Sequence, residues 1–251
     1  MIRLFRKIRQ QLLSETKYPI YLLYAGGEIL LVVLGILIAL QIDNWNEDKK
    51  DRITEQQYLL ALREEFIFND EELERVSLRN KTNADNMVKL VNHMGPDEFE
   101  INEEELGGLL RGSLSNEIQF NPSQGVLDEI ISSGKLGMFS SAELKFALSS
   151  WSGRLYRVRV KEQELSRIRY ITIDIIRNEG NLRMALGSFI EELGIEKARF
   201  KKGNLPLLRS TIFEGHMMGA VTMSLNLYNH HFPGLDKEID KILVIIEDQI
   251  H

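Results

Sequence analysis

The stretch "YLLYAGGEILLVVLGILIALQIDNW", residues 21–45, decides the architecture of this chain of 251 residues. Residues 20–42 form an apolar run that carries a single charged side chain, Glu28. At about 1.5 Å of rise per residue, this run is roughly 34 Å long as a helix, which exceeds a hydrocarbon core of about 30 Å. Because a backbone in lipid must satisfy its own polar groups, we predict a transmembrane helix over residues 20–42.

Two other interpretations of this run are a buried core helix and a cleaved signal peptide. Apolar core helices rarely extend past about 14 residues, and the apolar region of a signal peptide has about 7–15 residues before a small-x-small cleavage site. The run here is longer and ends in "ALQIDNW", which offers no good site. Aromatic residues near both ends also match interfacial belts: Tyr18, Tyr21, Tyr24 and Trp45. We therefore favour an uncleaved signal anchor.

Residues 1–19 predict a basic amphipathic helix that lies on the membrane surface. Phe5, Ile8 and Leu12 share one helical stripe, and basic side chains lie mostly elsewhere: Arg3, Arg6, Lys7 and Arg9. In a helix of this kind, the apolar face is buried at the surface of the bilayer and the basic side chains are attracted to anionic headgroups. The lipid bilayer is therefore the first expected partner.

The distribution of positive charge predicts the orientation. Five Lys and Arg residues precede the apolar run, and three follow it within a similar distance. Positive charge is enriched on the cytoplasmic side of a span, so this bias favours a cytoplasmic N-terminus. In a bacterium, the protein would be a single-pass protein of the inner membrane with residues 43–251 in the periplasm.

Glu28 lies on a stripe whose members are separated by three or four residues: Ala25, Glu28, Val32, Gly35 and Ala39. Small residues on one stripe allow helices to approach closely in lipid. An acid within the bilayer costs at least about 2.5 kcal/mol, and this cost falls if the acid is protonated or paired across a helix interface. We expect assembly along this face, with another copy or another membrane protein. Two alternatives remain open: Glu28 lies among the headgroups, or it takes part in ion or proton transport.

The periodicity after the span predicts an all-α fold in which residues 43–251 form one elongated helical bundle. An apolar stripe from Leu59 to Met94, interrupted by Asn69 and Asn80, predicts one long helix or two shorter ones. Residues 181–194 predict a short helix, and residues 207–230 predict another. A last helix is expected after Pro233.

Capping patterns predict where other helices begin. Asn102 followed by Glu105 is a capping box for a short helix that ends near Gly112. Asn121–Pro122 predicts a helix that starts at the proline and stops at Gly134. Ser140 followed by Glu143 predicts the start of a long helix that runs to about Gly180.

Motifs for catalysis or metal binding are not recognised. The chain has no cysteine, which excludes disulfides, thiolate metal sites and thiol nucleophiles. Its five histidines do not form a recognisable zinc pattern. "GGLLRG", residues 107–112, follows no strand and lacks the Lys-Ser/Thr of a phosphate loop. We predict no catalytic residue, metal or cofactor and expect a protein that is not an enzyme.

Charge gives two further expectations. The formal net charge of −6 does not favour nucleic-acid binding. A local basic cluster consists of Arg154, Arg157, Arg159, Lys161, Arg167 and Arg169. We expect these side chains to form a solvated face, with docking to an acidic partner or a lipid surface as the alternative.

The pattern "FRKIR", residues 5–9, followed by "GEILLVVLGILIALQIDNWNE", residues 27–47, resembles a family of uncharacterised single-pass membrane proteins from Bacteroidota-type bacteria. A second patch of resemblance is "FNPSQGVLDEIISSGKLGMFSSAELKFALSSW". The resemblance implies the membrane-anchored architecture and no activity.

These observations together predict a membrane-anchored interaction or scaffold protein of the bacterial envelope that assembles through its transmembrane face and its bundle. One alternative is a ligand-binding sensor or regulator that acts through a partner. The other is an accessory subunit for ion conduction or transport that uses Glu28.

Overall fold

The computed structural model describes residues 18–98, 100–187 and 189–250. Within these residues the secondary structure is helical and contains no strand, so the predicted all-α class is confirmed. The chain divides into two compact units, Met1–Gln57 and Tyr58–His251. The surface helix predicted for residues 1–19, with Arg3, Arg6, Lys7 and Arg9, falls almost wholly outside the described residues.

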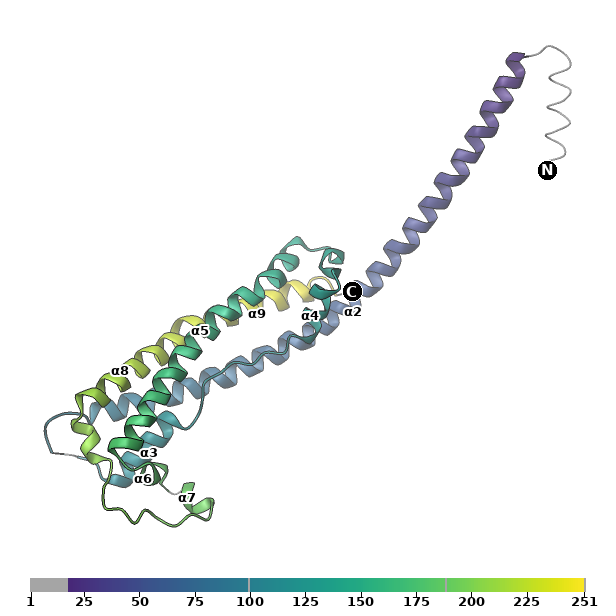
Figure 1. The fold of residues 1–251 in the computed structure, drawn as a ribbon. Helices are drawn as coiled ribbons and strands as arrows, with labels where there is room; N and C mark the ends of the chain where they lie inside the picture. Colours follow the sequence, from purple (N-terminus) through teal and green to yellow (C-terminus); the bar gives the residue numbers. More distant parts are fainter. Residues whose placement is uncertain (1–17, 99, 188, 251) are drawn as a thin grey trace. The chain divides into compact units, whose positions relative to one another are not determined.

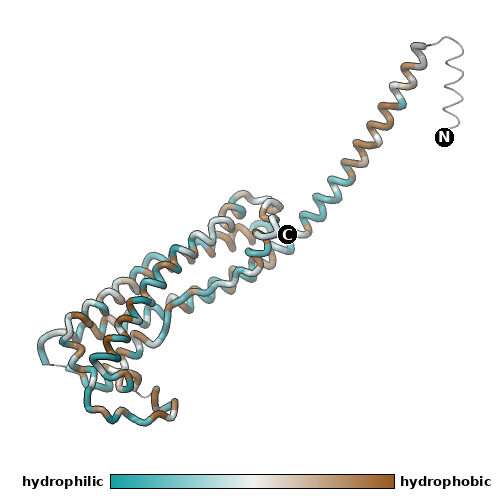
Figure 2. Tube along the Cα trace, in the orientation of Figure 1, coloured by the Kyte–Doolittle hydropathy of each residue, from teal (hydrophilic) through white to brown (hydrophobic). Residues whose placement is uncertain are grey.

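Helix α2 (Tyr18–Asn92) contains the predicted span and the apolar stripe that follows it as far as Val91, whereas Met94 lies just past the end of the helix. The stripe therefore belongs to one long helix that continues the span, which was one of the two expected arrangements. In the first unit, the apolar part of α2 is followed by a strongly polar stretch (Figure 2).

The second unit is a helical bundle built on the 58–92 part of α2, α5 (Ala142–Glu179), α8 (Thr211–Asn226) and α9 (Phe232–Glu247). Helix α5 packs along both α8 and α9 (Figure 1). Within its core, the ring of Phe66 meets the ring of Trp151 edge-on at 5.1 Å between centroids. Both side chains are almost fully buried, so the bundle has an apolar core of its own.

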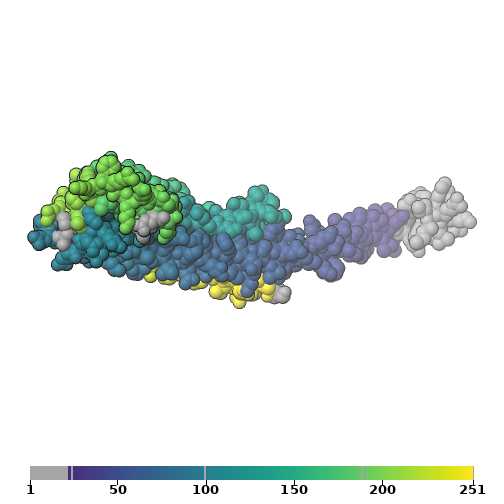
Figure 3. All heavy atoms as spheres, turned by 90° about the horizontal axis from the view of Figure 1, so that it is seen from below, coloured from purple at the N-terminus to yellow at the C-terminus, as the bar shows by residue number. Residues whose placement is uncertain are grey.

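Shorter helices cover the ends of the bundle: α3 (Glu103–Leu114), α4 (Gly125–Ser132), η1 (Lys135–Met138), α6 (Leu182–Leu186), α7 (Phe189–Glu192) and η2 (Leu205–Arg209). The predicted capping box of α3 is present, with Asn102 and Glu105 each bonded to the other's backbone. Helix α6 packs on α3, and the 180–205 part of the chain gathers over the same end of the bundle (Figure 3).

Two predicted helix starts are wrong. Helix α4 begins at Gly125 and not at Pro122, because the backbone at Ser123 is bonded to the side chain of Asn69 and the first helical turn is bonded to Glu65. The N-cap of α5 is Ser141 and not Ser140, since the Ser141 hydroxyl accepts the Leu144 N–H.

Glycine and proline also change the expected helix ends. The single helix predicted for residues 181–194 is divided into α6 and α7 at Gly187, whose φ is +55°. Pro233 does not interrupt the C-terminal helices, because a π-helical turn, η3 (Leu227–His231), joins α8 directly to α9. The Phe232 N–H donates to the Leu227 carbonyl, and this wider turn accommodates the proline that follows.

Candidate functional site

The predicted transmembrane face lies on the exposed surface of α2. Glu28, Val32, Gly35 and Ala39 are exposed, and Ala25 is half-buried. Eleven large apolar side chains between Ile29 and Ile42 are each at least 45% exposed. Full burial of an apolar side chain of this size is worth up to roughly 1.5–3 kcal/mol, so transfer of this surface to an apolar environment would be favourable.

Length and composition make α2 suitable for crossing a bilayer. Among the described residues, α2 is the one helix that is long and apolar enough to do so. In its most apolar 18-residue segment, no residue is buried. The packing of Ala25, Glu28, Val32, Gly35 and Ala39 against another span stays a prediction.

The two asparagines that interrupt the apolar stripe of α2 each bind a serine from a distant segment. The Asn69 amide donates to the Ser123 carbonyl at 2.9 Å and accepts the Ser123 N–H at 2.6 Å. The Asn80 amide donates to the Ser224 carbonyl at 2.8 Å and accepts the Ser224 hydroxyl. These side chains therefore hold the bundle together, and sequence spacing alone does not identify their partners.

Buried carboxylates do similar structural work. Glu65 accepts hydrogen bonds from the Ser123 hydroxyl, at 3.1 Å, and from two backbone N–H groups in the first turn of α4. Glu162 accepts the Phe120 N–H at 2.7 Å and pairs with Arg159 at 3.1 Å. Burial raises the pKa of Glu162, whereas the Phe120 N–H and Arg159 lower it.

Acidic side chains of α2 and α9 form a cluster near the surface of the bundle: Asp70, Glu74, Asp236 and Asp240. Burial, followed by the neighbouring carboxylates, raises the pKa of Asp70 and of Asp236. Within the described part of the chain, no group of three or more potential ligands from His, Cys, Asp and Glu is arranged to hold a metal ion.

The basic cluster of α5 is only partly a solvated face. Arg154 pairs with Glu238, and Lys161 pairs with Glu164. Arg159 donates to the Phe120 carbonyl, and Arg169 donates to the Leu114 carbonyl. Most of the cluster is therefore engaged within the bundle, while Arg157 and Arg167 are exposed.

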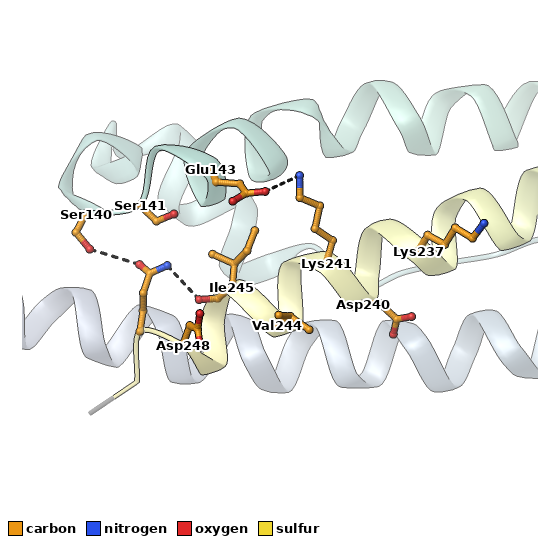
Figure 4. A pocket seen from close by; sticks show the side chains of 10 residues that line it. Ser140, Ser141, Glu143, Lys237, Asp240, Lys241, Val244, Ile245 and Asp248 are labelled. Atoms are coloured by element: carbon orange, nitrogen blue, oxygen red, sulfur yellow. Dashed lines mark hydrogen bonds and ion pairs between the residues drawn. The ribbon is translucent and has the colours of Figure 1, made fainter.

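A surface hollow lies between the start of α5 and the C-terminal half of α9 (Figure 4). Its charged groups pair with each other, as in the contact of 2.8 Å between Lys241 Nζ and Glu143 Oε1. The Ser140 hydroxyl donates to Gln249 on the same side. A hollow lined by both signs of charge, with several of its polar groups bonded to one another, has little to offer a charged ligand.

A second cavity, of about 790 Å³, lies between α3, the end of α5 and α6. Its apolar wall includes Leu110, Ile173, Ile176, Leu182 and Phe189, and its cationic residues are Arg111, Arg169 and Arg177. Among the described residues that line it, none is an Asp or a Glu. In the sequence, the glycine-rich segment "GGLLRG" of α3 is the feature that belongs to this cavity, but its pattern alone does not indicate a cavity.

Comparison with family models finds one that matches residues 28–176, described as "Family of unknown function (DUF6090)". Comparisons with curated proteins and with solved structures find no match.

Proposed function

We propose that this chain, which belongs to the DUF6090 family of unknown function, is a membrane-anchored interaction protein of the bacterial envelope. One observation carries the proposal: the apolar surface of α2 between Ile29 and Ile42 is exposed, whereas the bundle buries a core of its own. A bilayer supplies the missing apolar environment. The bundle is then free to bind other proteins.

The proposal includes a location and an orientation. The balance of Lys and Arg around the span supports a cytoplasmic N-terminus, with the bundle in the periplasm. Extraction of bacterial membranes with alkaline carbonate tests the anchor, because an integral protein stays in the pellet. Protease added to spheroplasts tests the orientation, since a periplasmic bundle is degraded. Release of the protein by carbonate would contradict the membrane anchor. A bundle that is protected from protease in spheroplasts but degraded in lysed cells would contradict the periplasmic orientation.

Assembly through the face of Ala25, Glu28, Val32, Gly35 and Ala39 completes the proposal. Gly35 and Gly26 form a matched pair for its test, since a Cβ at either would meet nothing within 4 Å. The helical repeat places Gly26 on the side of α2 opposite to this face. We expect Gly35→Leu and Glu28→Leu to reduce the size of the complex in mild detergent and Gly26→Leu to preserve it. An unchanged size for both face variants would exclude assembly through this surface.

A further inference from the structure

Helix α5 carries an exposed aromatic side chain and an exposed cation next to each other. Tyr156 is 68% exposed, and the helical repeat places it on the side of α5 opposite to the buried Val158. Arg157 is exposed as well. Its neighbours Arg154 and Arg159 form ion pairs within the bundle, whereas no ion pair of Arg157 occurs among the described residues. Tyrosine and arginine are enriched among the residues that contribute most to protein–protein binding.

A small hollow with an apolar floor lies where α2 meets the start of α9. Leu73 and Phe232 in its lining are buried, and Glu74 and Asp236 in its lining are exposed. Among the described residues that line it, none is basic. Its volume of about 270 Å³ lies below the range of roughly 300–1,000 Å³ that is typical of small-molecule sites. The hollow therefore suits one inserted side chain better than a free ligand.

The charge at this hollow favours a cation. Burial, followed by the neighbouring carboxylates, raises the pKa of Asp236. An approaching cation relieves this repulsion between like charges. Lys237 lowers the pKa of Asp236 but does not line the hollow, and Lys81 is paired with Asp85. An exposed guanidinium beside an aromatic ring therefore matches the hollow in both charge and apolar character.

Helices α2 and α5 run in the same direction through the bundle. Near one end, the ring of Phe66 in α2 contacts the ring of Trp151 in α5. Further along both helices, the Asn86 side chain lies against Gly112 of α3, and Arg169 donates to a carbonyl of the same helix. Positions that are equally far from the contact of the two rings therefore lie at the same level of the bundle.

Tyr156 and the hollow lie at nearly the same level. Counted from the contact of the two rings, Tyr156 is five residues further along α5 and Glu74 is eight residues further along α2. At about 1.5 Å of rise per residue, their levels differ by roughly 5 Å. Tyr156 faces away from the core, so one copy cannot fill its own hollow. Copies that are anchored in one membrane share an orientation, and a lateral contact between them joins surfaces at similar levels.

We propose that the bundle binds a second copy of this chain, with the Tyr156 ring of one copy in the hollow of the next and with Arg157 paired with Glu74 and Asp236. The contact joins two different surfaces, so it is heterologous and repeats from copy to copy in a ring or a row. This inference rests on the proposed membrane anchor, which gives the copies a common orientation. It does not depend on assembly through the transmembrane face.

Cysteine crosslinking in bacterial membranes tests this contact, since the chain contains no cysteine of its own. One tagged copy carries Ser152→Cys, one helical turn before Tyr156, and a differently tagged copy carries Ser77→Cys in the lining of the hollow. A short bismaleimide is added, and the carbonate-resistant fraction is probed for both tags. We expect a crosslinked dimer from this combination. Asn178→Cys in place of Ser152→Cys should give none, because Asn178 is exposed but lies roughly 39 Å further along α5.

Two matched comparisons test the side chains of the contact. Tyr156→Ala should abolish the crosslink, whereas Tyr170→Ala, at an exposed tyrosine roughly 21 Å further along α5, should preserve it. Arg157→Glu in the first copy, or Asp236→Arg in the second, should reduce the crosslinked fraction by about tenfold. The two charge reversals together should restore the crosslink, and this restoration would exclude misfolding as the cause of the loss.

The outcomes separate this contact from the anchor. Equal crosslinking of Tyr156→Ala and Tyr170→Ala, or no restoration by the paired charge reversals, would overturn the proposal. A dimer between copies that both carry only Ser152→Cys would also overturn it, because that pairing joins α5 to α5. A carbonate-resistant protein without the crosslink contradicts this contact alone, whereas release of the protein by carbonate contradicts the proposed anchor.

Discussion

The carboxylate of Glu65 in α2 accepts the backbone N–H of Leu127 in α4 at 3.0 Å, across 62 residues of sequence. The same carboxylate accepts the Val126 N–H at 3.0 Å. The N-terminus of a helix leaves its first N–H groups without partners within the helix. Here a residue of another helix supplies the missing acceptor, and the negative charge also suits the positive end of the helix dipole.

Removal of this carboxylate should destabilise the bundle. Glu65→Ala leaves two N–H groups without their acceptor, and we expect a loss of about 2–3 kcal/mol in the free energy of unfolding. Urea unfolding of the full chain in detergent, followed by far-ultraviolet circular dichroism, measures this loss. Glu64→Ala is the control because Glu64 is exposed and its ion pair with Arg63 lies at the surface. Equal midpoints for the two variants would contradict the role of Glu65.

The buried pair of Asn80 and Ser224 should show energetic coupling. Ser224→Ala removes the hydroxyl that donates to the Asn80 amide, and Asn80→Ala removes both contacts. Since these groups are in direct contact, a double-mutant cycle should give a coupling energy of about 0.5–3 kcal/mol. Thermal unfolding of the four proteins measures it. Additive effects of the two substitutions would show that the pair contributes no mutual stabilisation.

The pKa of Glu162 predicts how stability depends on pH. Burial raises this pKa above its ordinary value of 4.5, so the folded state binds a proton more tightly than the unfolded state does. Stability from Glu162 is therefore fully present below the unfolded pKa and is lost as pH rises through the folded pKa.

Glu162→Gln should remove this dependence while keeping an acceptor for the Phe120 N–H. We therefore expect the stability of the variant, measured relative to the parent chain, to increase between about pH 4 and pH 7. Urea unfolding at several pH values provides the measurement. A constant difference between the two proteins across this range would contradict the raised pKa.

A charge in the middle of the predicted span should oppose membrane insertion. Leu31→Arg places a cation near the centre of residues 20–42, at a cost of about 2.5–3.5 kcal/mol. We expect a smaller fraction of the protein to resist carbonate extraction. Leu60→Arg is the matched control, since Leu60 lies on the bundle part of α2 and is half exposed. The same loss from both variants would indicate misfolding and not a failure of insertion.

Sequence predicts those features of the fold that depend on neighbours along the chain. The capping box of Asn102 and Glu105 lies within one helical turn, and it is found as expected. The C-terminal end of α5 at Gly180 is also local and is confirmed. The start of α4 depends on Glu65 and Asn69 from another helix, so no pattern near Pro122 could reveal it.

The same distinction, between features set by neighbours along the chain and features set by distant segments, applies to the candidate sites. The span and its stripe of Ala25, Glu28, Val32, Gly35 and Ala39 follow from composition and helical period. The arginine-lined cavity joins Arg111 to Arg177, which lie in different helices, and spacing cannot bring them together. "GGLLRG" is a visible signal, but its meaning depends on the packing of α3 on α6.

The contacts that α2 makes with the end of the chain have a consequence for biosynthesis. Arg63 pairs with Glu247 across 184 residues, and Asn80 binds Ser224 across 144 residues. At a translation rate of about 5–20 residues per second, the ribosome releases α9 roughly ten to thirty seconds after α2. During that interval the buried stripe of α2 lacks its final covering, so the bundle completes its packing only after α9 has been synthesised.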